Sequence, residues 1–385
     1  MKNINHELAQ THIAFKDFYE QNLRKIYEKL EPERKKFLRS FIIRFIFYVI
    51  GVSFFLLLCA FGIIDKELLT SKGFMKLTLA IYGGWGIYVF MPFSNYRAAT
   101  KSRVMNILLS FWGNARYRSH ASYISDQDIS SSELFTCYNR CETDDSFYGF
   151  HKNVEMSVAE QVIKMEGNRG DTNIFKGALI LLEFNKKFQG KTVVKSKYRA
   201  LNILWNNPLF ILAVMVPVCL VLVIPFMMHD FIFSLICLFM MLGMFTVAFG
   251  LIYLTYRRKR PRKATQCVLL EGLAFMKKWK VYTDDQIAAR VILTPVLMEN
   301  IVKVCKLFHG KNVDFSFFSN KLLIAVHTRT NLFETTSLFL PALHYGKVRE
   351  VVNQLHSIFS VIDVLNIKDT KDVKTPTKSK KTEKF

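Results

Sequence analysis

Negative charge is scarce in this sequence. The chain has 31 Asp and Glu residues against 53 Lys and Arg residues, which gives a formal net charge of +22 over 385 residues. Such an excess of positive charge favours a partner that carries phosphate, either nucleic acid or a membrane surface. The sequence is also 51% hydrophobic, and much of the positive charge lies beside apolar runs. We therefore expect a membrane and no nucleic acid.

The sequence also lacks a disulfide framework and recognisable catalytic motifs. Its 7 cysteines are spread along the chain, and Cys59, Cys219 and Cys237 lie inside apolar runs, where a thiol behaves as a small hydrophobe. A glycine-rich phosphate loop, a nucleophile elbow and a zinc-protease motif are all absent. No enzyme class is indicated, and we predict no catalytic, cofactor-binding or metal-binding residue.

Ionised side chains are missing above all from residues 206–256, where Asp230 is the single exception. Helices of soluble domains average about 11–12 residues, so one buried helix does not explain this run. Its length predicts two membrane spans, at 208–228 and 231–256, joined by a tight turn at His229 and Asp230. Two further apolar runs, at 45–64 and 77–95, predict an earlier pair of spans.

Lys and Arg cluster beside these four runs on one side only. They precede the first span, follow the second, precede the third and follow the fourth, where the sequence reads "RRKRPRK". The loop 65–76 balances its lysines with acids, and the turn at 229–230 has no Lys or Arg. By the positive-inside rule, both termini and the middle segment are cytoplasmic. We predict a multi-pass membrane protein with two short external turns.

The cytoplasmic segments predict an α+β domain. Residues 146–165, 173–184 and 190–194 read as extended, and "VDFSFFSNKLLIAVHT" reads as a hairpin that turns at Ser319 and Asn320. Residues 96–112, 295–309 and 348–365 read as helices. Neither half has enough strands for a sheet of its own, so we expect one domain that is split by the second membrane hairpin.

The predicted fold class is thus an α+β cytoplasmic domain plus four transmembrane α-helices arranged as two hairpins. The predicted segments are a cytoplasmic amphipathic helix at 1–40, a first transmembrane hairpin at 41–96, the first half of the α+β domain at 97–205, a second transmembrane hairpin at 206–256, the second half at 257–367 and a disordered Lys-rich tail at 368–385.

Both ends of the chain leave alternatives open. The N-terminal helix has apolar residues at helical spacing. We favour the interpretation that it packs on its own domain or on a partner coil. The alternative is that it lies on the membrane surface. The Lys-rich tail either binds anionic lipid or is a dispensable solvated segment. The apolar residues of the helix are Leu8, Phe15, Tyr19, Leu23, Ile26 and Leu30.

Two kinds of side-chain cluster are candidates for chemistry. Cys137 and Cys141 have a spacing found in zinc sites, but His120 and His151 lie far from them in sequence, so two ordinary reduced thiols are the favoured interpretation. The acidic pairs Asp144–Asp145 and Asp284–Asp285 would hold Mg²⁺ or act as acid and base if the fold joined them. Adjacent strand residues face opposite sides, so each pair offers one inward ligand, and turn or cap roles are favoured.

Two stretches, "NIFKGALILLEFNKKFQGKTVV" and "VYTDDQIAARVILTPVLMENI", resemble a bacterial family catalogued as domain of unknown function three-one-three-seven. "SSELFTCYNRCETDDSFYG", "FSFFSNKLLIAVHT" and "LFE" at 332–334 fit the same pattern in the same order. The resemblance implies a bacterial membrane protein with a cytoplasmic domain, and it implies no activity. Similar members join the two stretches by a polar linker, whereas this chain has the third and fourth spans there.

The expected function is a membrane-anchored interaction or regulatory module at the inner membrane of a bacterium. Its expected partners are the lipid bilayer, through anionic headgroups, and a protein partner or a second copy of the chain. The alternative is an enzyme at the membrane surface that uses the acidic pairs. A transporter component is less favoured, because Arg44 is the one ionisable residue near a span and sits at its end.

Overall fold

The computed structural model describes residues 2–61, 63–64, 71–113, 115–135, 137–167, 171–184, 187–197, 266–308, 312–328 and 330–365, with side chains from residue 10 onward. The predicted spans at 208–228 and 231–256 and the Lys-rich tail lie outside these residues. The chain divides into two compact units. The first consists of Met1–Ala121, Phe147–His151 and Asn331–Phe359, and the second of Ser122–Ser146, Lys152–Thr330 and Ser360–Phe385.

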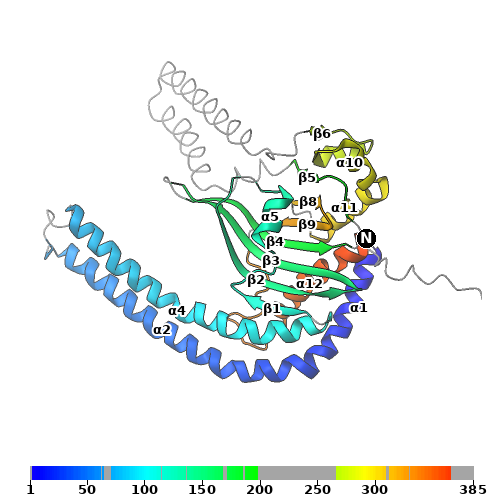
Figure 1. Ribbon diagram of the computed structural model, residues 1–385. Helices are drawn as coiled ribbons and strands as arrows, with labels where there is room; N and C mark the ends of the chain where they lie inside the picture. Colours follow the sequence, from blue (N-terminus) through cyan, green and yellow to red (C-terminus); the bar gives the residue numbers. More distant parts are fainter. Residues whose placement is uncertain are drawn as a thin grey trace, which may run out of the picture. The chain divides into compact units, whose positions relative to one another are not determined.

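Long helices dominate the first unit (Figure 1). The first predicted span belongs to a helix that begins well before it, at Arg24, and ends slightly earlier than expected. The second span continues into the basic segment after it, as predicted for 96–112. The elements of this unit are α1 (Lys2–Phe18), the short π-helix η1 (Tyr19–Leu23), α2 (Arg24–Ala60), α4 (Lys72–Ser110), β1 (Arg116–Ser119) and the greater part of α12 (Tyr345–Leu365).

Helices α2 and α4 form an antiparallel hairpin. The contacts between the two helices keep one antiparallel register along the hairpin. In each contact, the residue number on α2 and the residue number on α4 add to nearly the same value. The Tyr82 hydroxyl donates to the Gly51 carbonyl at 3.3 Å, and a side chain at Gly51 would run into the Trp85 ring. Further contacts in this register are Glu33 with Arg103, Phe37 with Tyr96, Phe41 with Phe90, Tyr48 with Trp85 and Phe55 with Tyr82.

The N-terminal helix packs on its own chain, which confirms the favoured interpretation. The Phe15 ring meets the Phe111 ring edge-on at 5.3 Å, and the Tyr19 ring meets the Tyr345 ring at 5.1 Å. Phe15 and Tyr19 are buried, as are Leu23 and others at helical spacing. The part of the apolar stripe from Phe15 to Leu30 is therefore largely covered by protein.

The second unit is built on an antiparallel sheet (Figure 1). Its strands lie in the order β2-β3-β4-β9-β8-β5-β7-β6, and the registers of β3 through β9 are antiparallel pairings. The strands are β2 (Arg140–His151, whose last five residues belong to the first unit), β3 (Val154–Met165), β4 (Thr172–Glu183), β5 (Thr192–Ser196), β6 (Gln266–Val268), β7 (Trp279–Thr283), β8 (Val313–Phe318) and β9 (Lys321–His327).

This strand order interleaves the two stretches that flank residues 198–265. Strand β5 comes before those residues, yet Val193 pairs with Tyr282 of β7 on one side and Ser316 of β8 on the other. Strand β4 likewise pairs with β9. The fold is therefore of the α+β class, and one sheet takes strands from both stretches.

Two hairpin turns differ in how visible they are in the sequence. The predicted turn at Ser319 and Asn320 is confirmed, with Ser319 at a φ of 50°. The extended conformation predicted for 146–165 is confirmed at 146–151 and 154–165, but the turn at Lys152 and Asn153, between β2 and β3, was not predicted. Both turn residues have positive φ, 49° and 63°, as a two-residue turn matched to strand twist requires.

Part of one face of this sheet is covered by α5 (Asp126–Ser132). Ile129 on this helix is buried against Leu179 of β4 and Leu323 of β9. The Ser125 side chain caps the helix by accepting from the Asp128 amide, which satisfies one of the free N–H groups at its start. Three more helices follow residues 198–265 in sequence: α9 (Leu273–Lys278), α10 (Gln286–Ile292) and α11 (Pro295–Leu307).

Candidate functional site

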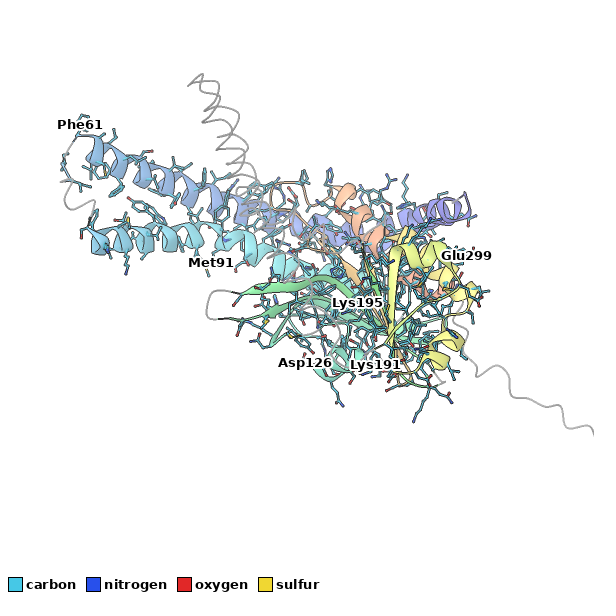
Figure 2. All side chains as sticks on the ribbon, turned by 90° about the horizontal axis from the view of Figure 1, so that it is seen from above. Phe61, Met91, Asp126, Lys191, Lys195 and Glu299 are labelled. Carbon is cyan, nitrogen blue, oxygen red and sulfur yellow. The ribbon has the colours of Figure 1, made fainter. Side chains whose placement is uncertain are left out.

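The outer part of the α2–α4 hairpin exposes apolar side chains along its length (Figure 2). Helices α2 and α4 are each long and apolar enough to cross a membrane, and almost none of their apolar windows is buried. These exposed large apolar residues are Ile42, Ile43, Phe45, Ile46, Phe47, Val49, Ile50, Phe54, Leu56, Leu57, Phe61, Ile63, Met75, Leu77, Leu79, Ile81, Ile87, Tyr88, Phe90 and Met91.

The base of this hairpin is held by an irregular segment, residues 331–344, which we call the strap. Glu334 of the strap accepts from the Arg97 side chain at 2.7 Å and from Lys101 Nζ at 3.1 Å. The Thr336 hydroxyl meets the Thr100 hydroxyl at 2.8 Å in a buried hydrogen bond. These contacts fix the strap along α4.

Helix α2 holds the other side of the strap. The Arg34 guanidinium donates to the Leu338 carbonyl at 2.9 Å and pairs with Glu31 at 2.7 Å. Glu31 in turn accepts from the Ala342 amide at 2.8 Å. The bond from Arg34 and that from the amide lower the pKa of Glu31, against the effect of its partial burial. Sequence reasoning missed the strap, apart from the family motif "LFE" within it.

A basic groove lies between α2 and α4, beside the inner end of the apolar segment. Its volume is about 900 Å³. Four of its lining side chains are cationic and none is acidic. The lining residues are Pro32, Lys35, Lys36, Arg39, Ser40, Ile43, Arg44 and Phe47 of α2 with Trp85 and Tyr88 of α4.

The cations of the groove differ in how firmly they are held. Arg44 donates to the Tyr88 carbonyl at 3.0 Å, and its guanidinium carbon lies 4.0 Å from the centre of the Tyr88 ring. Lys35, Lys36 and Arg39 are exposed, and no ion pair or hydrogen bond joins their side chains to the part of the chain that the structure describes. Sequence reasoning used these residues only as markers of orientation.

Three carboxylates gather on β2 and β3. Oxygens of Asp144, Asp145 and Glu160 all lie within 4.8 Å of one another. The prediction that an adjacent acidic pair offers one inward ligand is therefore wrong for Asp144 and Asp145. The alternation of strand residues is broken here, because Asp145 and Ser146 are both buried, at 1% and 0% exposure. Sequence reasoning missed Glu160, which is 3% exposed inside an apolar strand.

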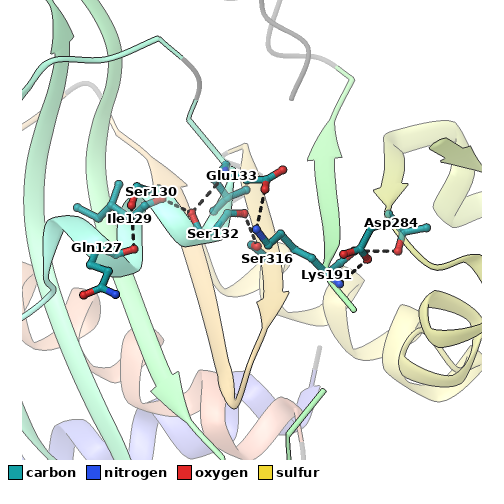
Figure 3. A network of polar contacts seen from close by, with 10 residues as sticks. Gln127, Ile129, Ser130, Ser132, Glu133, Lys191, Asp284 and Ser316 are labelled. Carbon is teal, nitrogen blue, oxygen red and sulfur yellow. Dashed lines mark hydrogen bonds and ion pairs between the residues drawn. The ribbon is translucent and has the colours of Figure 1, made fainter. Parts of the chain in front are cut away.

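The second acidic pair has the structural roles favoured for it. Asp285 caps α10 by accepting from the Ile287 and Ala288 amides at 2.8 and 3.1 Å. Asp284 accepts from the Lys191 amide at 2.6 Å (Figure 3). Gly190 permits this approach, since it has a φ of +67° and a Cβ there would lie 2.7 Å from the Asp284 carboxylate.

The same network ties α5 to the sheet. Lys191 Nζ donates to Glu133, the left-handed residue that ends α5, at 2.6 Å (Figure 3). The Ser316 hydroxyl of β8 donates to the Ser132 carbonyl at 2.6 Å. The motifs "GKTVV" and "VYTDDQ" therefore meet in space, although residues 198–265 separate them in sequence.

The fold does not join the two acidic pairs. Asp144 and Asp145 lie on β2, whereas Asp284 and Asp285 follow β7, and β3, β4, β9, β8 and β5 lie between these strands. At about 4.8 Å per strand, six steps separate the pairs by roughly 29 Å. One active site cannot use both pairs.

The cysteine pair gains no support as a zinc site. Cys137 is exposed and Cys141 is partly buried. Burial and the nearby Asp126 raise the pKa of Cys141 to about 11, which opposes the thiolate form that binds metal. Within the described ranges, the group of ligands close enough for a metal contains carboxylates and no cysteine or histidine.

Comparisons with known proteins identify a family but no activity. No curated protein matches the chain. One solved structure that matches is the crystal structure of the mycobacterial trehalose monomycolate transport factor A, TtfA. The match has 8% sequence identity and a TM-score of 0.29, and it covers 69% of this chain and 93% of the TtfA chain. This low score implies nothing about function. Residues 173–367 match the family described as "Protein of unknown function (DUF3137)". The chain belongs to this family.

Proposed function

We propose that this chain is a multi-pass inner-membrane protein of a bacterium whose four spans form two hairpins, with both termini in the cytoplasm. The hairpins hold the composite sheet domain at the inner surface of the membrane. There the domain acts as an interaction or regulatory module for a protein partner. The observation that carries this proposal is the exposed apolar surface of the α2–α4 hairpin.

The size of that surface argues for a bilayer around it. Twenty large apolar side chains of the hairpin region are 45–77% exposed. Full burial of such a side chain gains about 1.5–3 kcal/mol, so half-exposure forgoes about 1 kcal/mol each, or about 20 kcal/mol in all. That exceeds the about 5–15 kcal/mol by which a domain is stable. An apolar medium around the hairpin removes this deficit.

A second exposed surface supports an interaction role. Ile287 and Val291 lie four residues apart on α10 and therefore share one face of it, and they are 76% and 70% exposed. Leu269, Leu273 and Val296 are exposed to a similar degree, at 79%, 79% and 68%. An exposed apolar helix face such as that of Ile287 and Val291 is typical of a docking surface.

Two measurements on the full chain test the proposal. A carbonate wash of native membranes should leave the protein in the pellet, and a cysteine at position 230 should react with an impermeant maleimide in intact cells. Release by carbonate would refute membrane spanning. Labelling at 230 only after permeabilisation would refute the second hairpin.

The interaction role has its own test. A photo-crosslinking residue in place of Ile287 should yield one discrete adduct, while the same residue in place of the exposed Lys306 on α11 should not. Mass spectrometry of the adduct then separates a different protein from a second copy of this chain. Equal, diffuse labelling from both positions would contradict a specific docking surface.

The alternative, an enzyme at the membrane surface, now depends on one acidic cluster. Asp144, Asp145 and Glu160 form a set of oxygen ligands of the kind that Mg²⁺ or Ca²⁺ uses. Elemental analysis of the gently purified full chain tests it. A stoichiometric divalent ion that is lost in the Glu160→Gln variant would favour the enzyme over the interaction module.

A further inference from the structure

We propose that the basic groove between α2 and α4 binds one anionic phospholipid, with its phosphate among Lys36, Arg39 and Arg44 and its acyl chains along the apolar wall. This inference rests on the proposed function, since it requires the hairpin to cross the membrane. It adds a discrete lipid site to what would otherwise be general attraction of a basic protein to a membrane.

The lining of the groove changes from polar to apolar along α2. Lys35, Lys36 and Arg39 lie toward the N-terminal end, and Ile43 and Phe47 lie toward the apolar segment. A phospholipid changes in the same order, from a charged headgroup to hydrocarbon. The α2 wall of the groove therefore matches this ligand from end to end.

The depth of each cation also fits. Arg44 borders the apolar run, and at 1.5 Å per residue Arg39 lies about 7.5 Å, Lys36 about 12 Å and Lys35 about 13.5 Å before it. The headgroup layer is about 5–7 Å thick on each side of the hydrocarbon core. Arg44 and Arg39 bracket that layer, and the long Lys36 side chain can reach into it.

The charge of the groove calls for an anion. No acid lines it, and the acids nearest in sequence are engaged elsewhere. Glu31 pairs with Arg34 at 2.7 Å, and Glu33 pairs with Arg103 at 3.2 Å. A phosphate would supply the acceptors for charge-assisted hydrogen bonds from the lysine and arginine side chains.

Two aromatic residues make a lipid a better occupant than a free phosphate. Trp85 and Tyr88 line the groove from α4, and Trp and Tyr are enriched at the headgroup level of membranes. The Tyr88 ring and carbonyl hold Arg44 in place, so one cation is already oriented. A volume of about 900 Å³ far exceeds a single phosphate and suits a headgroup with the first part of its chains.

The test uses the full chain in phosphatidylcholine nanodiscs with a minor fraction of phosphatidylglycerol. Lipid that stays bound after transfer to detergent is counted by native mass spectrometry. The wild-type protein should retain phosphatidylglycerol in preference to phosphatidylcholine. The variant Lys35→Gln/Lys36→Gln/Arg39→Gln should bind it roughly a hundredfold more weakly, because each cation near an anionic surface contributes about fivefold.

A matched variant controls for net charge. Lys25, Lys29 and Arg290 are exposed and lie outside the groove, so Lys25→Gln/Lys29→Gln/Arg290→Gln removes the same charge and should retain the lipid. The conservative variant Lys35→Arg/Lys36→Arg should retain it too. Equal retention by both triple variants would overturn the site.

Two further outcomes separate the possible failures. Loss of the wild-type protein from carbonate-washed membranes would refute the proposed function itself. Firm membrane insertion with no preference for phosphatidylglycerol would refute only the lipid site. Displacement of the lipid by inorganic phosphate would assign the groove to a free anion and overturn the lipid proposal.

Discussion

Gly177 offers a sharp test of how closely β4 and β9 approach. Its φ is +154°, and a Cβ there would lie 2.9 Å from the Thr328 amide and closer still to the Val326 carbonyl. A side chain in this backbone region costs about 1–3 kcal/mol. Relieving the overlap must also separate the strands next to the Gly177–His327 pair, at about 0.5–1.5 kcal/mol for each lost hydrogen bond.

The Gly177→Ala substitution should therefore destabilise the protein by about 2–6 kcal/mol. For a domain of about 150–250 residues, each kcal/mol lowers the unfolding midpoint by about 2–4 °C. Gly113→Ala is the control, because its φ is +138° but its Cβ would meet the Phe150 carbonyl at an ordinary 3.5 Å. Differential scanning fluorimetry of the full chain in detergent compares the two. Equal losses at both positions would refute the argument from strand contact.

Three further predictions concern other parts of the fold. Glu334→Gln should lower the free energy of unfolding by about 2 kcal/mol, because it weakens the charge-assisted bonds from Arg97 and Lys101. Glu20→Gln, in the exposed pair with Arg24, should change it by under about 0.5 kcal/mol. Chemical denaturation compares the two variants, and equal effects would contradict this prediction. Asp285→Ala should cost about 1 kcal/mol and Asp285→Ser much less, since Ser also caps helices; equal midpoints would argue against the cap. Because burial raises the pKa of Cys141 to about 11, its alkylation, followed by mass spectrometry, should keep accelerating with pH up to that value, and a plateau near pH 8.5 would show an ordinary thiol.

Local patterns predicted the elements that local chemistry determines. The β8–β9 turn was visible because Ser319 and Asn320 interrupt two alternating apolar stretches. Helix α11 was visible from its apolar spacing, and it begins where Thr294 caps it and Pro295 occupies its first turn. The long helices α2 and α4 were visible from apolar runs and their basic flanks. In each case the deciding residues are neighbours in sequence.

The strap was hidden because its contacts are distant in sequence. Residues 331–344 have no helical or strand period, and many of their partners are side chains more than 200 positions away, such as Thr100 for Thr336 and Arg34 for the Leu338 carbonyl. The acidic cluster was hidden for a related reason. Glu160 meets Asp144 and Asp145 only because the chain reverses at Lys152 and Asn153, a turn with no glycine or proline to reveal it.

The cations of the basic groove could be predicted only in part. The number of Lys and Arg residues here, Lys35, Lys36, Arg39 and Arg44 among them, predicts the membrane orientation of the first span, whichever way the side chains point. Their spacing along α2, together with Trp85 and Tyr88 from the second helix, makes them one surface. That grouping requires the register of α2 against α4, which no single stretch of sequence contains.

Measuring the orientation of the α2–α4 hairpin tests the proposed membrane topology most directly. A cysteine at Ser71, in the connection between the two helices, should react with an impermeant maleimide in intact cells. The native Cys137, which is exposed on the second unit, should react only after permeabilisation. Labelling of the Ser71→Cys variant only after permeabilisation, or of Cys137 in intact cells, would contradict a membrane hairpin that holds the sheet domain in the cytoplasm.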